Sequence, residues 1–256
     1  MKRRQLIGYA GLGLVSTFAT NLISPFQADA QSNSSLSIKW LGHTCFLFSG
    51  GGKKVLVNPF RTIGCTAGYR LPNVSANLVL ISSQLLDEGA VENLPGDPKL
   101  VYQPGVYKFQ GMEIQGISID HDRVGGRRFG KNVAWIWEQA GVRILHLGGA
   151  AAPVSLEQKI LIRRPDLVFV PVGGSEKAYN AQEAKQAVDT VNARIVVPTH
   201  YRTQAADENA CDIVPVDDFL SLMQGVKVTK LGSDGFTVNS GNLPQNTEVK
   251  VLSYKF

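Results

Sequence analysis

The sequence predicts an α/β protein built as an αββα four-layer sandwich, with two β-rich halves packed face to face and helices outside. Two observations support this fold class. Short apolar runs bounded by Gly and polar turns recur along both halves of the chain, as expected of buried strands. In the second half, helical segments at 155–162 and 181–191 alternate with such runs. With 256 residues, 44% of them hydrophobic, the chain can bury a full core.

Residues 31–256 are predicted to form one domain whose elements follow each other in a regular order. A further helix is expected at 216–223, and Ser155 is a candidate N-cap for the helix at 155–162. The acidic pair Asp87-Glu88 is expected at the start of one more helix, where the helix dipole stabilises carboxylates. The predicted strands are 36–41, 45–48, 54–57, 78–81, 100–102, 106–109, 112–119, 133–137, 142–147, 167–171, 195–199 and 226–230, followed by closing strands in the tail.

Residues 1–30 have the pattern of an export signal. The basic start contains the pair Arg3-Arg4, an apolar run with three glycines follows from Gly8 to Ile23, and Ala28-Asp29-Ala30 fits a cleavage site. The apolar run is short for a membrane span, and the paired arginines favour twin-arginine export. We therefore expect a cleaved signal, a protein in the periplasm or thylakoid lumen, and no stable membrane span after cleavage.

The charge of the chain excludes a role based on nucleic-acid binding. The formal net charge is +5, and residues 1–30 carry a net +2 of it, which leaves +3 after cleavage. Such a mild positive charge does not predict a nucleic-acid partner.

The three cysteines have different predicted roles. An exported protein can form disulfides, and Cys65 and Cys211 both lie in polar or Gly-rich loops, which makes them the better pair. Cys45 lies in an apolar strand and is expected to be a buried free thiol. Since there is no Cys-x-x-Cys or Cys/His cluster, a structural zinc site is not expected.

Four residues that can act as acids, bases or metal ligands follow predicted strands. Asp87 and Glu88 come after 78–81, His121 after 112–119 and His200 after 195–199. Open α/β sheets place their chemistry at the carboxyl ends of strands. We interpret His43 as a turn histidine that bonds nearby backbone, with a catalytic role as the alternative, and His146 as a satisfied core histidine.

The order of motifs resembles the metallo-β-lactamase fold, in particular its lactonase-like Zn-dependent hydrolases. The resemblance covers roughly residues 38–230, and it implies the αββα sandwich with a site along one edge between the sheets. The motifs that carry it are Gly42-His43, Asn58-Pro59, His121-Asp122 with Gly125-Gly126, Gly130-Lys131-Asn132, and Pro198-Thr199-His200-Tyr201.

The chain departs from the family pattern at the metal ligands. The family has Ser/Thr-His-x-His-x-Asp-His after the strand at 78–81, and the resemblance implies that Ser83, Leu85 and Glu88 replace its three histidines while Asp87 is kept. The Asp that bridges two metals in the family is replaced by Gly149. A further change is Asn58, where the family has Asp near the ligands. The resemblance therefore implies that the dinuclear zinc centre is lost.

Three classes of function follow. The first is a non-catalytic exported relative whose cleft, salt-bridged and without metal, binds a small anionic ligand or a protein partner. The second is a mononuclear hydrolase of lactones or phosphoesters, with Asp87, His121 and His200 catalytic and one divalent metal (Zn, Mn or Fe) held by Asp87, Glu88, His121 and His200. The third is a purely structural or assembly protein. The basic residues Arg123, Arg127, Arg128 and Lys131 could meet an anion or form a solvated loop.

Overall fold

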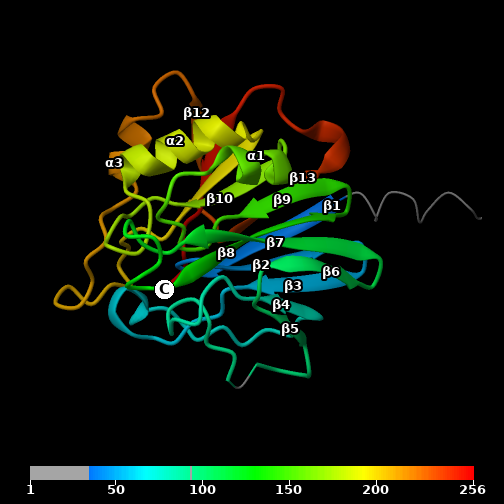
Figure 1. Ribbon diagram of the computed structural model, residues 1–256, viewed down its shortest axis with the longest axis horizontal. Helices are drawn as coiled ribbons and strands as arrows, with labels where there is room; N and C mark the ends of the chain where they lie inside the picture. The colour runs from blue at the N-terminus through cyan, green and yellow to red at the C-terminus, as the bar shows by residue number, and fades with distance from the viewer. Residues whose placement is uncertain (1–34, 93) are drawn as a thin grey trace, which may run out of the picture.

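The computed structural model describes residues 35–92 and 94–256, and two β-sheets form the centre of this part of the chain (Figure 1). The six-stranded sheet has the order β13-β1-β2-β3-β4-β5, and the eight-stranded sheet β12-β14-β11-β10-β9-β8-β7-β6. The strands of the first sheet are β1 (Ser35–Gly42), β2 (Cys45–Gly50), β3 (Lys53–Val57), β4 (Leu78–Leu80), β5 (Lys99–Val101) and β13 (Gly235–Asn239). Those of the second are β6 (Gly105–Phe109), β7 (Met112–Asp120), β8 (Lys131–Gln139), β9 (Val142–His146), β10 (Leu167–Pro171), β11 (Ile195–Thr199), β12 (Lys227–Lys230) and β14 (Glu248–Val251).

The core lies between the two sheets and is rich in aromatic side chains. Phe48 on β2 packs edge-to-face on Trp137 of β8 with ring centroids 5.0 Å apart, and Phe46 packs on Phe169 of β10 at 4.7 Å. All four rings are buried. Such pairs add roughly 0.5–1.5 kcal/mol each beyond the area they bury. These contacts join strands from both halves of the chain, which confirms the predicted two-sheet α/β sandwich.

The helices lie on the outer side of the eight-stranded sheet, above it in Figure 1. The helices of the described residues are α1 (Leu156–Ile162), α2 (Ala181–Val191) and α3 (Asp217–Ser221), with short 3-10 turns at Gly64–Thr66 and Ser240–Asn242. Ser155 caps α1 as predicted, because its hydroxyl accepts a hydrogen bond from the Gln158 N–H. Asn180 caps α2 in the same way.

The prediction of a helix starting at Asp87-Glu88 is wrong. The N–H groups of Glu88 and Gly89 both bond to the Leu85 carbonyl, which makes a single turn, and the next N–H, from Ala90, bonds instead to Pro59 at 2.9 Å. That bond draws the chain back toward the end of β3, so the turn cannot continue as a helix. The side chains of Asp87 and Glu88 therefore owe their environment to tertiary contacts rather than to a helix dipole.

One edge of the sandwich collects the ends of several strands. β3, β4 and β5 run parallel, as do β9, β10 and β11, so their carboxyl ends lie at common edges. The β1–β2 turn lies at this edge as well, because Phe46 at the start of β2 pairs with Val57 at the end of β3. The strand predicted at 78–81 is buried on both faces, since the side chains of Leu78, Val79 and Leu80 are all 0% exposed.

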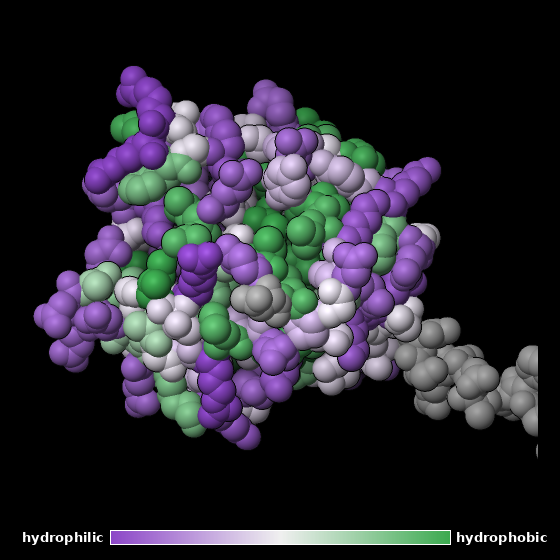
Figure 2. All heavy atoms as spheres, turned by 90° about the horizontal axis from the view of Figure 1, so that it is seen from below, coloured by the Kyte–Doolittle hydropathy of each residue, from purple (hydrophilic) through white to green (hydrophobic). Residues whose placement is uncertain are grey.

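The face opposite the helices carries long loops. Figure 2 shows apolar side chains gathered in a hollow on this face, with polar side chains around it. Among the described residues no helix is long and apolar enough to cross a membrane. The predicted export signal at 1–30 lies outside the described residues and stays a prediction.

Candidate metal centre

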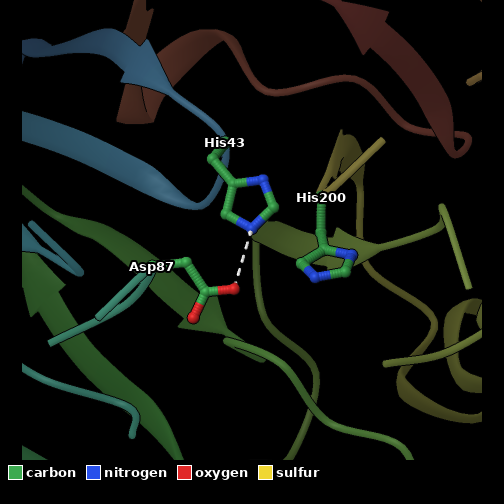
Figure 3. A group of neighbouring side chains, drawn as sticks. All are labelled: His43, Asp87 and His200. Carbon is green, nitrogen blue, oxygen red and sulfur yellow. Dashed lines mark ion pairs between the residues drawn. The ribbon is translucent and has the colours of Figure 1, made fainter. Parts of the chain in front are cut away.

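Three side chains from distant parts of the chain meet at this edge: His43, Asp87 and His200 (Figure 3). His43 comes from the β1–β2 turn, Asp87 from the loop after β4, and His200 directly follows β11. One ligand-type atom from each lies within 4.8 Å of the others. His43 Nε2 is 4.0 Å from Asp87 Oδ2, and the two imidazole centroids are 4.4 Å apart.

The backbone holds both histidines in an unusual conformation. His43 has φ 52° and His200 has φ 50°, in the left-handed region that non-glycine residues rarely adopt. The indole of Trp40 fixes the turn by donating to the His43 carbonyl at 2.9 Å. Gly173 donates its N–H to the His200 carbonyl at 2.8 Å, and a Cβ on Gly173 would lie 2.1 Å from that oxygen. Backbone strain of this kind persists only where the surrounding structure compensates for it, and such residues are concentrated at functional sites.

Burial and neighbouring charges set the protonation of the cluster. Burial lowers the pKa of His43 from 6.5 to about 4, although Asp87 partly opposes this. Burial also lowers the pKa of His200 well below its usual range. For Asp87, burial acts to raise the pKa, but the charges of Lys177 and His43 outweigh it and hold the pKa at about 2. At neutral pH the cluster thus contains two neutral imidazoles and one carboxylate, the forms that bind a metal ion.

The hydrogen bonding of the cluster is incomplete. His43 is 1% exposed, yet neither of its ring nitrogens has a hydrogen-bond partner in the described part of the chain, and the same holds for Nδ1 of His200. Leaving such groups unpaired is costly, so each calls for an explanation. Two imidazoles and a carboxylate at this spacing suit one divalent transition-metal ion. Lys177 opposes such an ion, because its ammonium contacts Asp87 Oδ2.

Glu88 and His121 form a second, separate cluster. His121 Nε2 lies 3.5 Å from Glu88 Oε2, and both side chains are almost fully buried. His121 Nδ1 donates to the Gly149 carbonyl at 2.5 Å, and the Ser83 hydroxyl donates to Glu88 Oε2 at 3.0 Å. Burial raises the pKa of Glu88, and the charge of His121 partly offsets this. The predicted four-residue ligand set is thus divided: Asp87 and His200 lie with His43, while Glu88 and His121 pair with each other.

Gly149 leaves no space for a side chain. A Cβ there would lie 2.2 Å from His121 Cε1 and 2.9 Å from Glu88 Oε1, closer than non-bonded atoms allow. Its N–H donates to Asn132 Oδ1 at 2.9 Å, so the loop is held in this position from the other side. His121 and Glu88 therefore fill the space at residue 149.

The cluster opens into a cleft of about 380 Å³. A disulfide between Cys65 and Cys211 joins two loops that line it, which confirms the predicted pair. Backbone hydrogen bonds from Gly68 to Ala205 (2.7 Å) and from Asp207 to Gly64 (3.0 Å) hold the same two loops together. The cleft is lined by His43, Ile63, Gly64, Cys65, Leu85, Leu86, Asp87, Lys177, His200, Ala210, Asp212 and Ile213. A neighbouring hollow of about 480 Å³ shares Ile63 with it.

Three of the four basic residues at the loop after β7 are paired with carboxylates. Arg123 pairs with Glu183, Arg128 with Glu176, and Lys131 with Asp120. The Asp122 carboxylate organises this loop by accepting four backbone N–H groups, from Val124, Gly126, Arg128 and Phe129. These hydrogen bonds outweigh the effect of burial and hold the pKa of Asp122 far below its usual value. An anion at Arg123, Arg128 or Lys131 would have to displace an internal carboxylate, whereas Arg127 donates to the Val124 carbonyl at 2.9 Å.

Two residues that lie at the candidate cluster, His43 and Lys177, were not in the predicted ligand set. His43 was interpreted as a turn histidine, and its Gly-His turn motif was the available signal. No sequence pattern indicated Lys177, because it is a single lysine in a polar loop. Cys45 is buried and is a free thiol, as predicted. His146 is fully buried and stacks on Phe169; its Nδ1 accepts from the Gly148 N–H at 3.1 Å, and its Nε2 has no partner among the described residues.

The two-sheet sandwich is the fold of metallo-β-lactamase-type proteins, and the chain belongs to this superfamily. A profile of the beta-lactamase superfamily domain matches residues 37–200, more than half of the chain.

Named relatives point the same way. A metal-dependent hydrolase from Thermococcus onnurineus is 28% identical over 193 residues, covering 66% of this chain and 85% of the relative. One from Thermoplasma acidophilum is 24% identical over 196 residues, again covering 66% of this chain and 84% of the relative.

Among solved structures, a Thermotoga maritima protein described as a Zn-dependent hydrolase of the metallo-β-lactamase superfamily is 28% identical. It has a TM-score of 0.67 and covers 85% of this chain and 98% of its own. An isothiocyanate hydrolase from Delia radicum gut bacteria shares the fold at 14% identity and a TM-score of 0.59, covering 79% of this chain and 98% of its own.

Proposed function

We propose that the protein is a metal-dependent hydrolase that binds one divalent cation through His43, Asp87 and His200. The relatives named metal-dependent hydrolases favour this function over the non-catalytic binding protein that the altered ligand motif predicts. The proposed set keeps Asp87 and His200 of the predicted ligands Asp87, Glu88, His121 and His200, and it includes His43 in place of Glu88 and His121.

The observation that carries the proposal is the cluster of buried, unpaired ligand atoms. Both nitrogens of His43 and one of His200 lack partners among the described residues, and a carboxylate oxygen lies close to them. A buried polar group is normally hydrogen-bonded unless an ion or water completes it. One cation would bind one nitrogen of each imidazole together with the Asp87 carboxylate, which accounts for a ligand atom from each of the three side chains.

The residues around the cluster favour one cation rather than two. The Gly149 position has no room for a bridging carboxylate while His121 stays where it is, and Glu88 is engaged by Ser83 and His121. Leu85 places an apolar side chain in the cleft.

When bound, a divalent cation supplies Lewis acidity that polarises a scissile bond and makes water a better nucleophile at neutral pH. The chain's own residues set the position and the surroundings of the reacting centre. His43, Asp87 and His200 orient the reacting centre, and the apolar Ile63, Leu85, Leu86 and Ile213 line the cleft beside it. An ester, lactone or phosphoester has the bond polarity that this arrangement acts on.

Elemental analysis combined with hydrolysis assays on generic lactones and phosphodiesters tests the proposal. We expect one equivalent of Zn, Mn or Fe per chain, and we expect H43A and D87N to lose both the cation and turnover. D212N is a matched control, because Asp212 lines the same cleft outside the cluster and should keep both. Absence of any bound cation, or binding that survives H43A and D87N, would contradict the proposal; two equivalents per chain would contradict the single-cation site.

A further inference from the structure

Lys177 reaches the candidate metal centre from the loop between β10 and α2. Its ammonium contacts Asp87 Oδ2, and the two side chains are 24% and 15% exposed. Among the described residues that line the cleft, Lys177 is the one lysine or arginine. Its position gives the site a fixed positive charge beside the carboxylate.

The loop that carries Lys177 is clamped on both sides by one arginine. Arg123 donates to the Ser175 carbonyl at 2.8 Å and to the Ala178 carbonyl at 2.9 Å, and its Nε and a terminal nitrogen both bond to Glu183 at 2.7 and 2.6 Å. A guanidinium can make these planar, paired contacts and an ammonium cannot. Four hydrogen bonds from Arg123 therefore hold the segment that carries Lys177.

We propose that Lys177 is the anion-binding residue of the site and that Arg123 positions it. In the metal-free cluster, Asp87 and Lys177 neutralise each other. When a cation takes the Asp87 carboxylate, the ammonium loses its partner and the cluster gains two positive charges. An oxyanion is then the complementary ligand, and Lys177 is within reach of the same cleft to bind it.

This inference rests on the proposed cation site, and it names the substrate class: compounds with a negatively charged oxygen at or beside the scissile bond, such as phosphoesters or esters with a neighbouring carboxylate. A neutral lactone would leave the Lys177 charge without a partner. The same geometry predicts competition, since Lys177 and the cation share one carboxylate. Removing Lys177 should therefore tighten cation binding while weakening anion binding.

Inorganic phosphate is the probe, and the first measurement needs no metal. The D87N substitution removes the charge that neutralises Lys177, so metal-free D87N should bind phosphate in calorimetric titrations. Binding should fall at least about fivefold in D87N/K177M, the scale of one charge-assisted hydrogen bond. In D87N/K185M it should not change, because Lys185 pairs with Asp189 on the surface of α2. Equal phosphate affinity in D87N and D87N/K177M would overturn the proposal.

The second measurement uses the cation-loaded protein. K177M should bind the cation about tenfold more tightly than wild type. Phosphate should competitively inhibit hydrolysis by the wild type but not by K177M. In the D87N background, R123Q should weaken phosphate binding and R127Q should not, since Arg127 bonds only within its own loop. If R123Q has no effect there, the positioning role of Arg123 is wrong. If wild type binds no cation but D87N still binds phosphate through Lys177, the proposed function fails and the anion site stands.

Discussion

Replacing Gly149 with alanine tests whether His121 and Glu88 fill the space at this position. The added Cβ would lie 2.2 Å from His121 Cε1 and 2.9 Å from both His121 Nδ1 and Glu88 Oε1. These atoms belong to buried side chains, and His121 is also held by its hydrogen bond to the Gly149 carbonyl. The imidazole must therefore move by several tenths of an ångström or more.

The expected loss of stability has two parts. Overpacking a filled interior costs about 1–3 kcal/mol. Weakening the hydrogen bond between His121 Nδ1 and the Gly149 carbonyl costs roughly another 0.5–1.5 kcal/mol. We therefore expect G149A to lower the free energy of unfolding by about 2–4 kcal/mol. Since Gly149 does not have a positive φ, backbone strain adds nothing.

Denaturant unfolding measures this loss, provided that the m-value stays constant. G241A is the matched control, because a Cβ on Gly241 meets nothing closer than 3.4 Å and should change stability by less than about 0.5 kcal/mol. The double variant G149A/H121A removes the clashing ring, so the two substitutions should be coupled favourably by about 2 kcal/mol. A G149A protein as stable as wild type, or additivity in the double variant, would refute the reasoning.

Three further predictions follow from other parts of the structure. C65S/C211S should lose up to about 5 kcal/mol of unfolding free energy, which is the loop-entropy value for a sequence separation of 146. Denaturant titration measures this loss, with C45S as the control. A loss below about 1 kcal/mol would show that the backbone hydrogen bonds between the two loops are sufficient to hold them together. Burial lowers the pKa of His146 from 6.5 to about 3, so the stability that its neutral form contributes is complete above pH 6.5 and decreases as pH falls toward 3. Between pH 6.5 and 4, the wild type should lose roughly 3 kcal/mol more unfolding free energy than H146N. Parallel pH profiles of the two proteins would contradict this. D122N should make trypsin cleave faster after Arg127 and Arg128, because the four N–H groups held by Asp122 lose a charged acceptor; an unchanged cleavage rate would show that the loop holds its shape without it.

Local patterns in the sequence were sufficient for most of the secondary structure. The bounds predicted for β10, α2 and β11 agree with the structure because each is a continuous apolar or amphipathic segment with clear turn residues at its ends. The Cys65–Cys211 pair could also be predicted, since both cysteines lie in loops that follow strands ending at one edge. The helix at Asp87 could not be excluded, because the hydrogen bond that ends the turn goes to Pro59, far away in the sequence.

The sequence by itself determined the two-sheet α/β fold, the family and the edge at which polar residues gather, because apolar periodicity and short motifs are local properties. Only the tertiary structure decided how those polar residues are grouped. His43 joins Asp87 and His200 across 157 residues, and Glu88 turns away to pair with His121. Lys177 reaches Asp87 from another loop. Such pairings depend on the positions of side chains from several distant elements at once, and no local pattern along the chain encodes those positions.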